Sequence, residues 1–334
     1  MSAKPVRIVL VTFYEPGGGL PGEFTHYRDR LGFRLASDAP KLPCPVYEND
    51  DGMIALITGP SGLATGHSVS ALGWCGHYDL TQSYWILSGI AGANPNVVSL
   101  GSAVWHDWLV DGEICYEIDS SETPQGWPYG TFPMGCRGPV NASMPVAPPA
   151  AGFREYAFET PASLLRWAVS VSRDVPIDDP EDLQEFRQRF TGHPVALQPP
   201  SISVGTNLSA SRYWHGPVLN QWAEDWCAHF SQGQSSFATS AMEDFPALRV
   251  IKDLGEAGRA DPERFLSLRC ASNFTLPAPG VDILTSLCGP EGTVGEPDFP
   301  SLAPCLENGY RAVNAVLQAL LSDWATHQHT PPTA

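Results

Sequence analysis

Leu87-Ser-Gly-Ile-Ala-Gly-Ala-Asn-Pro95 is the segment from which the architecture of this 334-residue chain follows most directly. It overlaps a continuous apolar run at residues 84–88, which is typical of a strand buried on both faces of a parallel or mixed sheet. The small residues that follow let the backbone approach a ligand closely. In α/β proteins, turns of this kind line the crevice in which small molecules bind.

Two further turns repeat the pattern. Thr12-Phe-Tyr-Glu-Pro-Gly-Gly-Gly19 follows an apolar run at residues 7–12, and Thr58-Gly-Pro-Ser-Gly-Leu-Ala-Thr-Gly66 follows one at residues 53–58. Three such turns after buried strands predict one shared crevice. Pro16 and Pro21 break the Gly-x-Gly-x-x-Gly arrangement that opens a dinucleotide-binding helix, so we expect no nucleotide cofactor.

The remaining apolar patterns predict an α/β fold. Further strands are expected at residues 102–110, 201–205, 250–252 and 265–271, and helices at residues 63–76, 163–171, 179–190, 218–230 and 307–324. Asp179 and Pro180 are typical of a helix N-cap followed by proline in the first turn. We predict a single domain over residues 1–334, with Pro- and Gly-rich insertions at about 120–160 and 276–304.

Composition excludes several classes of partner. The 19 Lys and Arg residues against 36 Asp and Glu residues give a formal charge of −17, which disfavours nucleic acids and anionic membrane surfaces. The sequence contains no run of 18 apolar residues, so we predict no membrane span. The short apolar N-terminus fits a first strand better than a leader. The eight cysteines are scattered, without metal-ligand spacing, so we expect reduced thiols, no metal and a cytoplasmic location.

Seven short motifs follow one another along the chain in a characteristic order. They are Leu87 to Pro95, Leu100-Gly-Ser102, Tyr116-Glu-Ile-Asp119, Gly205-Thr-Asn-Leu-Ser209, Arg212-Tyr-Trp-His-Gly216, Ala241-Met-Glu-Asp244 and Arg269-Cys-Ala-Ser-Asn273. In this order they resemble the purine nucleoside permease (NUP) family, which is itself similar to the nucleoside phosphorylase and nucleosidase superfamily. The resemblance implies a partly closed central mixed sheet flanked by helices, assembly into a homo-oligomer, and cleavage of the N-glycosidic bond of a purine nucleoside.

The resemblance also implies roles for single residues. Met242 and Glu243 match the ribose-binding Met-Glu pair of the superfamily, although Glu243 could instead cap a local turn. Asn273 matches a position where many nucleosidases carry an Asp that protonates the leaving purine. An amide can only hydrogen-bond, which favours 6-oxopurines such as inosine or guanosine, unless Asn273 is a structural turn residue or an inert replacement. Arg269 matches the Arg that orients this residue, with a buried salt bridge as the alternative.

Other positions have weaker assignments. Ser88 and Gly89 belong to the crevice turn and are expected to contact substrate. Tyr213 and Trp214 lie where the superfamily stacks aromatic rings on the purine, and His215 could hydrogen-bond sugar or base. Core packing is an equally good interpretation of these aromatic residues.

The attacking group remains the open question. Residues 58–66 and 88–95 contain no Lys or Arg to hold phosphate, so we expect an attacking water, with Glu15 as its base and Glu23 as the second choice. Arg28 or Arg30 could restore a phosphate site. The alternatives are a phosphate-dependent phosphorylase and a non-catalytic nucleoside-binding component of uptake.

Overall fold

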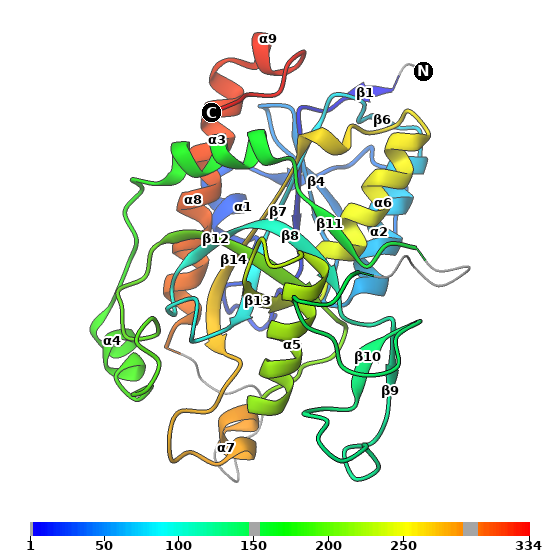
Figure 1. Cartoon of the computed structure of the whole chain (residues 1–334). Coiled ribbons are helices and arrows are strands. Elements are labelled where there is room, and N and C mark those ends of the chain that lie inside the picture. Colours follow the sequence, from blue (N-terminus) through cyan, green and yellow to red (C-terminus); the bar gives the residue numbers. More distant parts are fainter. Residues whose placement is uncertain (1–2, 147–153, 290–299) are drawn as a thin grey trace.

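The computed structural model describes residues 3–146, 154–289 and 300–334, and a ten-stranded sheet runs through its centre (Figure 1). The strand order is β11-β8-β12-β13-β7-β2-β5-β4-β3, and β14 pairs with both β7 and β8. The strands of this sheet are β2 (Ile8–Thr12), β3 (Arg34–Leu35), β4 (Val46–Glu48), β5 (Met53–Ile57), β7 (Tyr84–Ala93), β8 (Ala103–Asp111), β11 (Ala157–Glu159), β12 (Ile202–Ser209), β13 (Phe237–Ala241) and β14 (Phe265–Phe274). Two small additional sheets pair β1 (Lys4–Pro5) with β6 (Tyr78–Asp79) and β9 (Cys115–Glu117) with β10 (Thr131–Pro133).

The double pairing of β14 closes part of the sheet. Because β14 joins β7 to β8, the strands β8, β12, β13, β7 and β14 form a ring, from which β2, β5, β4 and β3 extend. The pairing is mixed: β14 is parallel to β7 and antiparallel to β8, while β12 is parallel to both of its neighbours. The predicted mixed, partly closed sheet is therefore confirmed.

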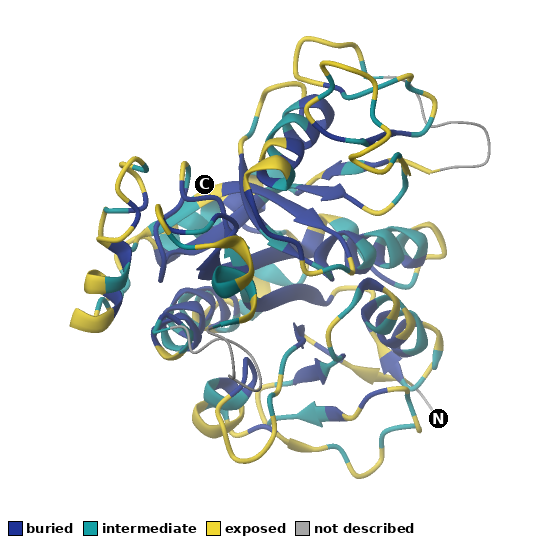
Figure 2. Cartoon of the chain, turned by 90° about the horizontal axis from the view of Figure 1, so that it is seen from below, coloured by how far each residue is buried: buried dark blue, intermediate teal, exposed yellow. Residues whose placement is uncertain are grey.

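Helices cover both faces of the sheet, which leaves most of its central strands dark blue in the burial view (Figure 2). On β2, Val9 and Val11 face the core shared with α2 and α6, whereas Ile8 and Leu10 face the core shared with α3 and α8. This two-sided burial explains the continuous apolar runs. The helices are α1 (Thr25–Leu31), α2 (Gly62–Trp74), α3 (Ala162–Ser172), α4 (Glu181–Arg187), α5 (Pro217–Phe230), α6 (Asp244–Glu256), α7 (Ile283–Cys288), α8 (Leu302–Ser322) and α9 (Trp324–His327), with a 3₁₀ turn η1 (Pro262–Arg264).

Two local predictions are wrong. Residues 250–252 lie inside α6 and form no strand, because Leu248, Ile251 and Leu254 recur at three-residue spacing and bury one helical face. Asp179 does not cap α4: the N-cap is Pro180, and the Asp179 carboxylate instead forms two hydrogen bonds with Arg187, at 2.6 and 2.9 Å. The Asp179 carboxylate, predicted to cap the helix, therefore binds the buried guanidinium of Arg187 instead.

Both predicted insertions carry some secondary structure. The first contains β10, which pairs with β9 just before it, and Tyr129, whose hydroxyl donates to Asp225 of α5 at 2.9 Å. The second contains α7. Residues 147–153 and 290–299 of these insertions lie outside the described residues. In the described part of the chain, no helix combines the length and apolarity that crossing a bilayer requires.

Candidate functional site

The candidate site lies where β7 changes its partner. β7 pairs with β2 up to Leu87 and with β13 from Gly92 onward. Ile90, between these two ladders, uses its backbone for side chains instead: its N–H donates to Glu23 Oε1 at 2.8 Å, and its carbonyl accepts from Arg269 Nη1 at 3.1 Å. A change of strand partner is where α/β sheets commonly form ligand crevices.

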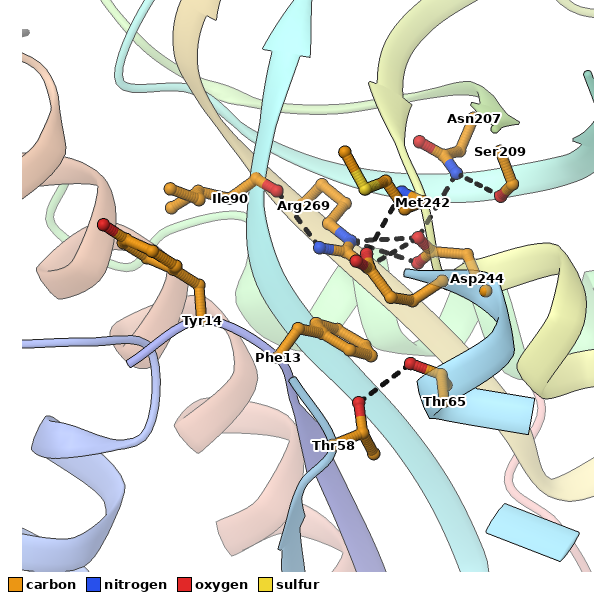
Figure 3. A network of polar contacts seen from close by, with 12 residues as sticks. Phe13, Tyr14, Thr58, Thr65, Ile90, Asn207, Ser209, Met242, Asp244 and Arg269 are labelled. Atoms are coloured by element: carbon orange, nitrogen blue, oxygen red, sulfur yellow. Dashed lines mark hydrogen bonds and ion pairs between the residues drawn. The ribbon is translucent and has the colours of Figure 1, made fainter. Parts of the chain in front are cut away.

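Arg269 of β14 is the centre of this site (Figure 3). Its Nη2 donates to Glu243 Oε2 at 2.7 Å, and its Nε donates to the two oxygens of Asp244 at 3.0 and 3.2 Å. The guanidinium also lies over the ring of Phe13, 4.1 Å from the ring centre. Burial alone would lower the pKa of Arg269, but the neighbouring carboxylates of Asp244, Glu243 and Glu23 raise it, so the group is a fixed cation.

Glu243 follows β13 and reaches the turn after β5. Its Oε1 accepts from the Ser61 N–H at 3.0 Å, and its Oε2 accepts from the Met242 N–H at 3.1 Å as well as from Arg269. Ser61 has φ 110°, a strained value for a residue other than glycine, at the N-cap of α2. Since a carboxylate offers about four acceptor positions, Glu243 is held firmly and keeps capacity for a further donor.

Glu23 is buried just before the start of α1. Its Oε2 accepts from the backbone N–H groups of Phe13 and Tyr14 at 2.7 and 3.0 Å, while Oε1 binds Ile90. Burial raises the pKa of Glu23 to about 7, against the opposing effect of Arg269. A Cβ at Gly89 would lie 2.7 Å from Glu23 Oε1 and 2.6 Å from Arg269 Nη1, so this position requires glycine.

Glu15, the first choice for the base, lies outside this cluster. It is exposed, and its Oε1 accepts from the Phe24 N–H at 2.7 Å, which anchors the entry to α1. Partial burial raises the pKa of its carboxyl group. The glycines at 17–19 all have positive φ, and the loop returns where the Glu23 N–H donates to the Tyr14 carbonyl at 3.0 Å. Glu23, and not Glu15, therefore lies near Arg269, on the other side of Gly89 Cα.

Asn273 lies on the same strand as Arg269. It pairs with Gly92 across a register shift, and the hydroxyl of Ser272 is 3.1 Å from its Oδ1. Its side chain is 9 % exposed. With Oδ1 facing Ser272, the Nδ2 group is left as the donor toward a ligand.

The other predicted contacts divide into two groups. Trp214 packs in a core cluster, with ring centres 5.9 Å from both Trp222 and Phe237, and so follows the packing interpretation. Tyr213 is exposed, and His215 is 3.0 Å from the hydroxyl of Ser286, with its pKa lowered by burial. The Ser88 hydroxyl is buried 2.7 Å from that of Tyr27, which is a contact within the fold.

Sequence reasoning missed Asp244 and Phe13. Both lie inside quoted motifs, and both contact Arg269, but neither has a role that residue type alone would reveal. Three carboxylates, Glu23, Glu243 and Asp244, thus surround one guanidinium. When all are ionised the cluster is negative, which suits a ligand that develops positive charge. No group of three or more potential metal ligands occurs in residues 3–146, 154–289 and 300–334.

Comparison with known proteins supports the architecture. The model of the family described as purine nucleoside permease (NUP) matches residues 5–332. A probable purine nucleoside permease of Schizosaccharomyces pombe is 25% identical over 291 residues, 86% of this chain and 80% of that protein. A purine nucleoside permease of Candida albicans is 25% identical over 230 residues, 68% of this chain, and the matched part spans 55% of that longer protein.

Solved structures share the fold at low sequence identity. The 5′-methylthioadenosine/S-adenosylhomocysteine nucleosidase of Neisseria meningitidis has a TM-score of 0.54 at 13% identity, covering 95% of this chain and 100% of that one. The futalosine hydrolase of Helicobacter pylori has a TM-score of 0.55 at 11% identity, covering 94% and 98%. The fold predicted from the motif order is thereby confirmed.

Proposed function

Because this chain belongs to the purine nucleoside permease (NUP) family, and because its sheet holds a buried cluster of carboxylates at the point where β7 changes partner, we propose that it hydrolyses purine nucleosides at the N-glycosidic bond. The proposed substrates are 6-oxopurine ribonucleosides such as inosine and guanosine, and the products are base and ribose. Similar folds are found in proteins whose names describe nucleosidases and a futalosine hydrolase. One observation carries the choice of water as the attacking group: the position of Glu23.

In this proposal Glu243 binds the sugar. Its remaining acceptor capacity faces the ribose hydroxyls, while Arg269, Ser61 N–H and Met242 N–H fix its orientation. As the bond to the base breaks, positive charge develops on the sugar ring. The negative charge of Glu243 and Glu23 stabilises this oxocarbenium-like transition state, because preorganised charge in a buried site requires little reorganisation.

Glu23 is the proposed base for water. Its carboxylate already accepts the N–H groups of Phe13, Tyr14 and Ile90, the backbone donors that an incoming oxyanion would need. A phosphate dianion at this place would face a carboxylate. A water molecule instead gives its proton to Glu23 while its oxygen bonds to C1′. The bond from C1′ to the purine nitrogen breaks, and the departing base takes a proton from solvent.

The first test is inosine cleavage in phosphate-free buffer. We expect hypoxanthine and ribose in equal amounts, at a rate that does not change when phosphate is added at about 10–50 mM. A phosphate concentration in this range would saturate a phosphorylase whose KM for phosphate is about 1 mM. Chromatography of the sugar product checks this. Strict dependence on phosphate with ribose 1-phosphate as product would establish a phosphorylase. Nucleoside binding without any release of base in either buffer would establish a binding module.

The second test concerns Asn273 and base preference. In the proposal its Nδ2 donates to N7 of a 6-oxopurine, which leaves readily without full protonation. Asn273→Asp supplies a carboxylic acid that can protonate N7 whatever the 6-substituent. We expect the ratio of kcat/KM for adenosine over inosine to rise about 100-fold, within the range of general acid catalysis. Competition between the two nucleosides measures that ratio, and an unchanged ratio would show that Asn273 does not recognise the base. Ser272→Ala tests whether Ser272 orients the Asn273 amide, and we expect it to change the same ratio by less.

A further inference from the structure

The five strands β8, β12, β13, β7 and β14 close into a small barrel. Inside it, next to Arg269, five buried side chains form a closed ring of polar contacts. His106 Nδ1 is 2.8 Å from Ser267 Oγ, and its Nε2 is 3.0 Å from Thr239 Oγ1. Thr239 donates to Asn207 Oδ1 at 2.9 Å. Asn207 and Ser267 then both donate to Asp244, which completes the ring.

Each member of this ring comes from a different element. β8 supplies His106, β12 supplies Asn207, β13 supplies Thr239, β14 supplies Ser267, and Asp244 begins α6. All five side chains are almost completely buried, with at most 1 % of any residue exposed. Polar groups buried this deeply are costly unless they are satisfied, so the shared hydrogen bonds favour one fixed arrangement.

Asp244 connects the ring to the candidate site. Its carboxylate accepts from Arg269 Nε on one side and from the ring on the other, and Figure 3 shows it lying between Arg269 and Asn207. Burial would raise the pKa of Asp244, but Arg269 and His106 together hold it below its ordinary value, so the group is charged. Burial lowers the pKa of His106 to about 4, so the imidazole is neutral at neutral pH. It then donates to only one of its two hydroxyl neighbours, because Ser267 and Thr239 direct their own protons to Asp244 and Asn207.

We propose that Asp244 is a positioning residue for the site: the ring fixes its carboxylate, and the carboxylate holds Arg269 and divides the charge of that guanidinium between itself, Glu23 and Glu243. The inference rests on the proposed function in taking Glu23 as the group that receives the proton. The consequence is specific. Asp244 contacts no reacting atom, yet it controls how strongly Arg269 stabilises the ionised form of Glu23.

The charged and titratable groups around Glu23 come from three parts of the chain. Arg269 approaches from β14, Glu243 from the end of β13, and Tyr27 from α1, while the backbone amides of β7 and the first turn complete the surroundings. Arg269 is the cation among the causes acting on Glu23, and it lowers the pKa of that carboxyl. Any change in how Arg269 is shared therefore changes the proton affinity of Glu23.

The experiment is a pH titration of Glu23 in protein labelled with ¹³C-glutamate, without substrate. The carboxyl resonance of Glu23 is identified by its absence in Glu23→Gln. In Asp244→Asn the side chain keeps its size but loses its charge, so Arg269 acts more strongly on the two glutamates. We expect the midpoint of the Glu23 titration to move to lower pH by about one unit. An unchanged midpoint in the folded variant would overturn the inference.

Two further variants complete the design. Asp107→Asn, on the same strand as His106 but bound to Ser235 at 2.7 Å, is the matched control and should leave the midpoint in place. If Asp244→Asn does not fold, Ser267→Ala removes one donor from Asp244 with all charges kept. Asp244 then attracts Arg269 more strongly, and the midpoint should rise by a few tenths of a unit; no movement contradicts the inference. The titration needs no turnover, so its result is independent of the proposed hydrolase activity. A protein without that activity can still show these shifts, and an active protein can lack them.

Discussion

Glu243→Gln is expected to lower kcat/KM for inosine about 1000-fold while the fold stays intact. The amide keeps the size of the side chain but removes the negative charge that the developing sugar cation requires. Its NH₂ group would also face either the Ser61 N–H or the N–H donors of Met242 and Arg269, so the alignment with the ribose hydroxyls is lost. Steady-state kinetics with inosine, together with circular dichroism and thermal unfolding, measure the effect.

A matched control is available at the surface. Glu155 pairs with Arg249 at 2.9 Å but is exposed and belongs to neither the sheet crevice nor the barrel interior. Glu155→Gln removes the same charge from a similar glutamate–arginine pair and should change kcat/KM by less than about twofold, because exposed ion pairs contribute little. Near-normal turnover in Glu243→Gln would show that the sugar is bound elsewhere.

Glu23→Gln is the second variant with a large expected effect. Loss of the proposed proton acceptor should reduce kcat by about 10³, within the range for general base catalysis. Its signature is the pH profile. Glu23 must be ionised to accept a proton, and burial raises its pKa to about 7, so wild-type activity should rise with pH and level off above that value. The rising limb should be absent in Glu23→Gln.

For Glu23, the expected effect of rising pH on stability is opposite to its effect on activity. Its pKa is raised above the ordinary value of 4.5, so the folded protein binds the proton more tightly than the unfolded chain. Its contribution to stability is therefore complete below about pH 4.5 and is lost as the pH rises through about 7. Activity and this part of the stability thus change in opposite directions over the same interval.

Glu15→Gln separates the two candidate bases. Glu15 is exposed and anchors the Phe24 N–H, so its replacement should lower kcat by no more than a few-fold. The rising limb of the pH–activity profile should remain. If the large loss and the altered pH profile instead followed Glu15→Gln, the first choice made from the sequence would be restored and Glu23 would be structural.

The amino-acid sequence determined the framework of this protein. Apolar runs such as residues 84–88, buried on both faces, required a covered sheet, and the family resemblance carried by the motifs implied its partial closure. Glu243, Arg269 and Asn273 could be named as candidates because each is part of a motif whose order is visible along the chain. These are properties of neighbouring residues, and local patterns record them directly.

The tertiary structure alone decided which groups meet. Glu23 lies nearer Arg269 than Glu15 does because the loop with three positive-φ glycines returns to the Tyr14 carbonyl at Glu23, and Asp244 gained its contacts because five strands close into a barrel and bring His106, Asn207 and Ser267 together. Neither arrangement leaves a local pattern. Burial, shared hydrogen bonds and the proton affinity of Glu23 depend on distances between residues far apart in the sequence, and only the closed fold sets those distances.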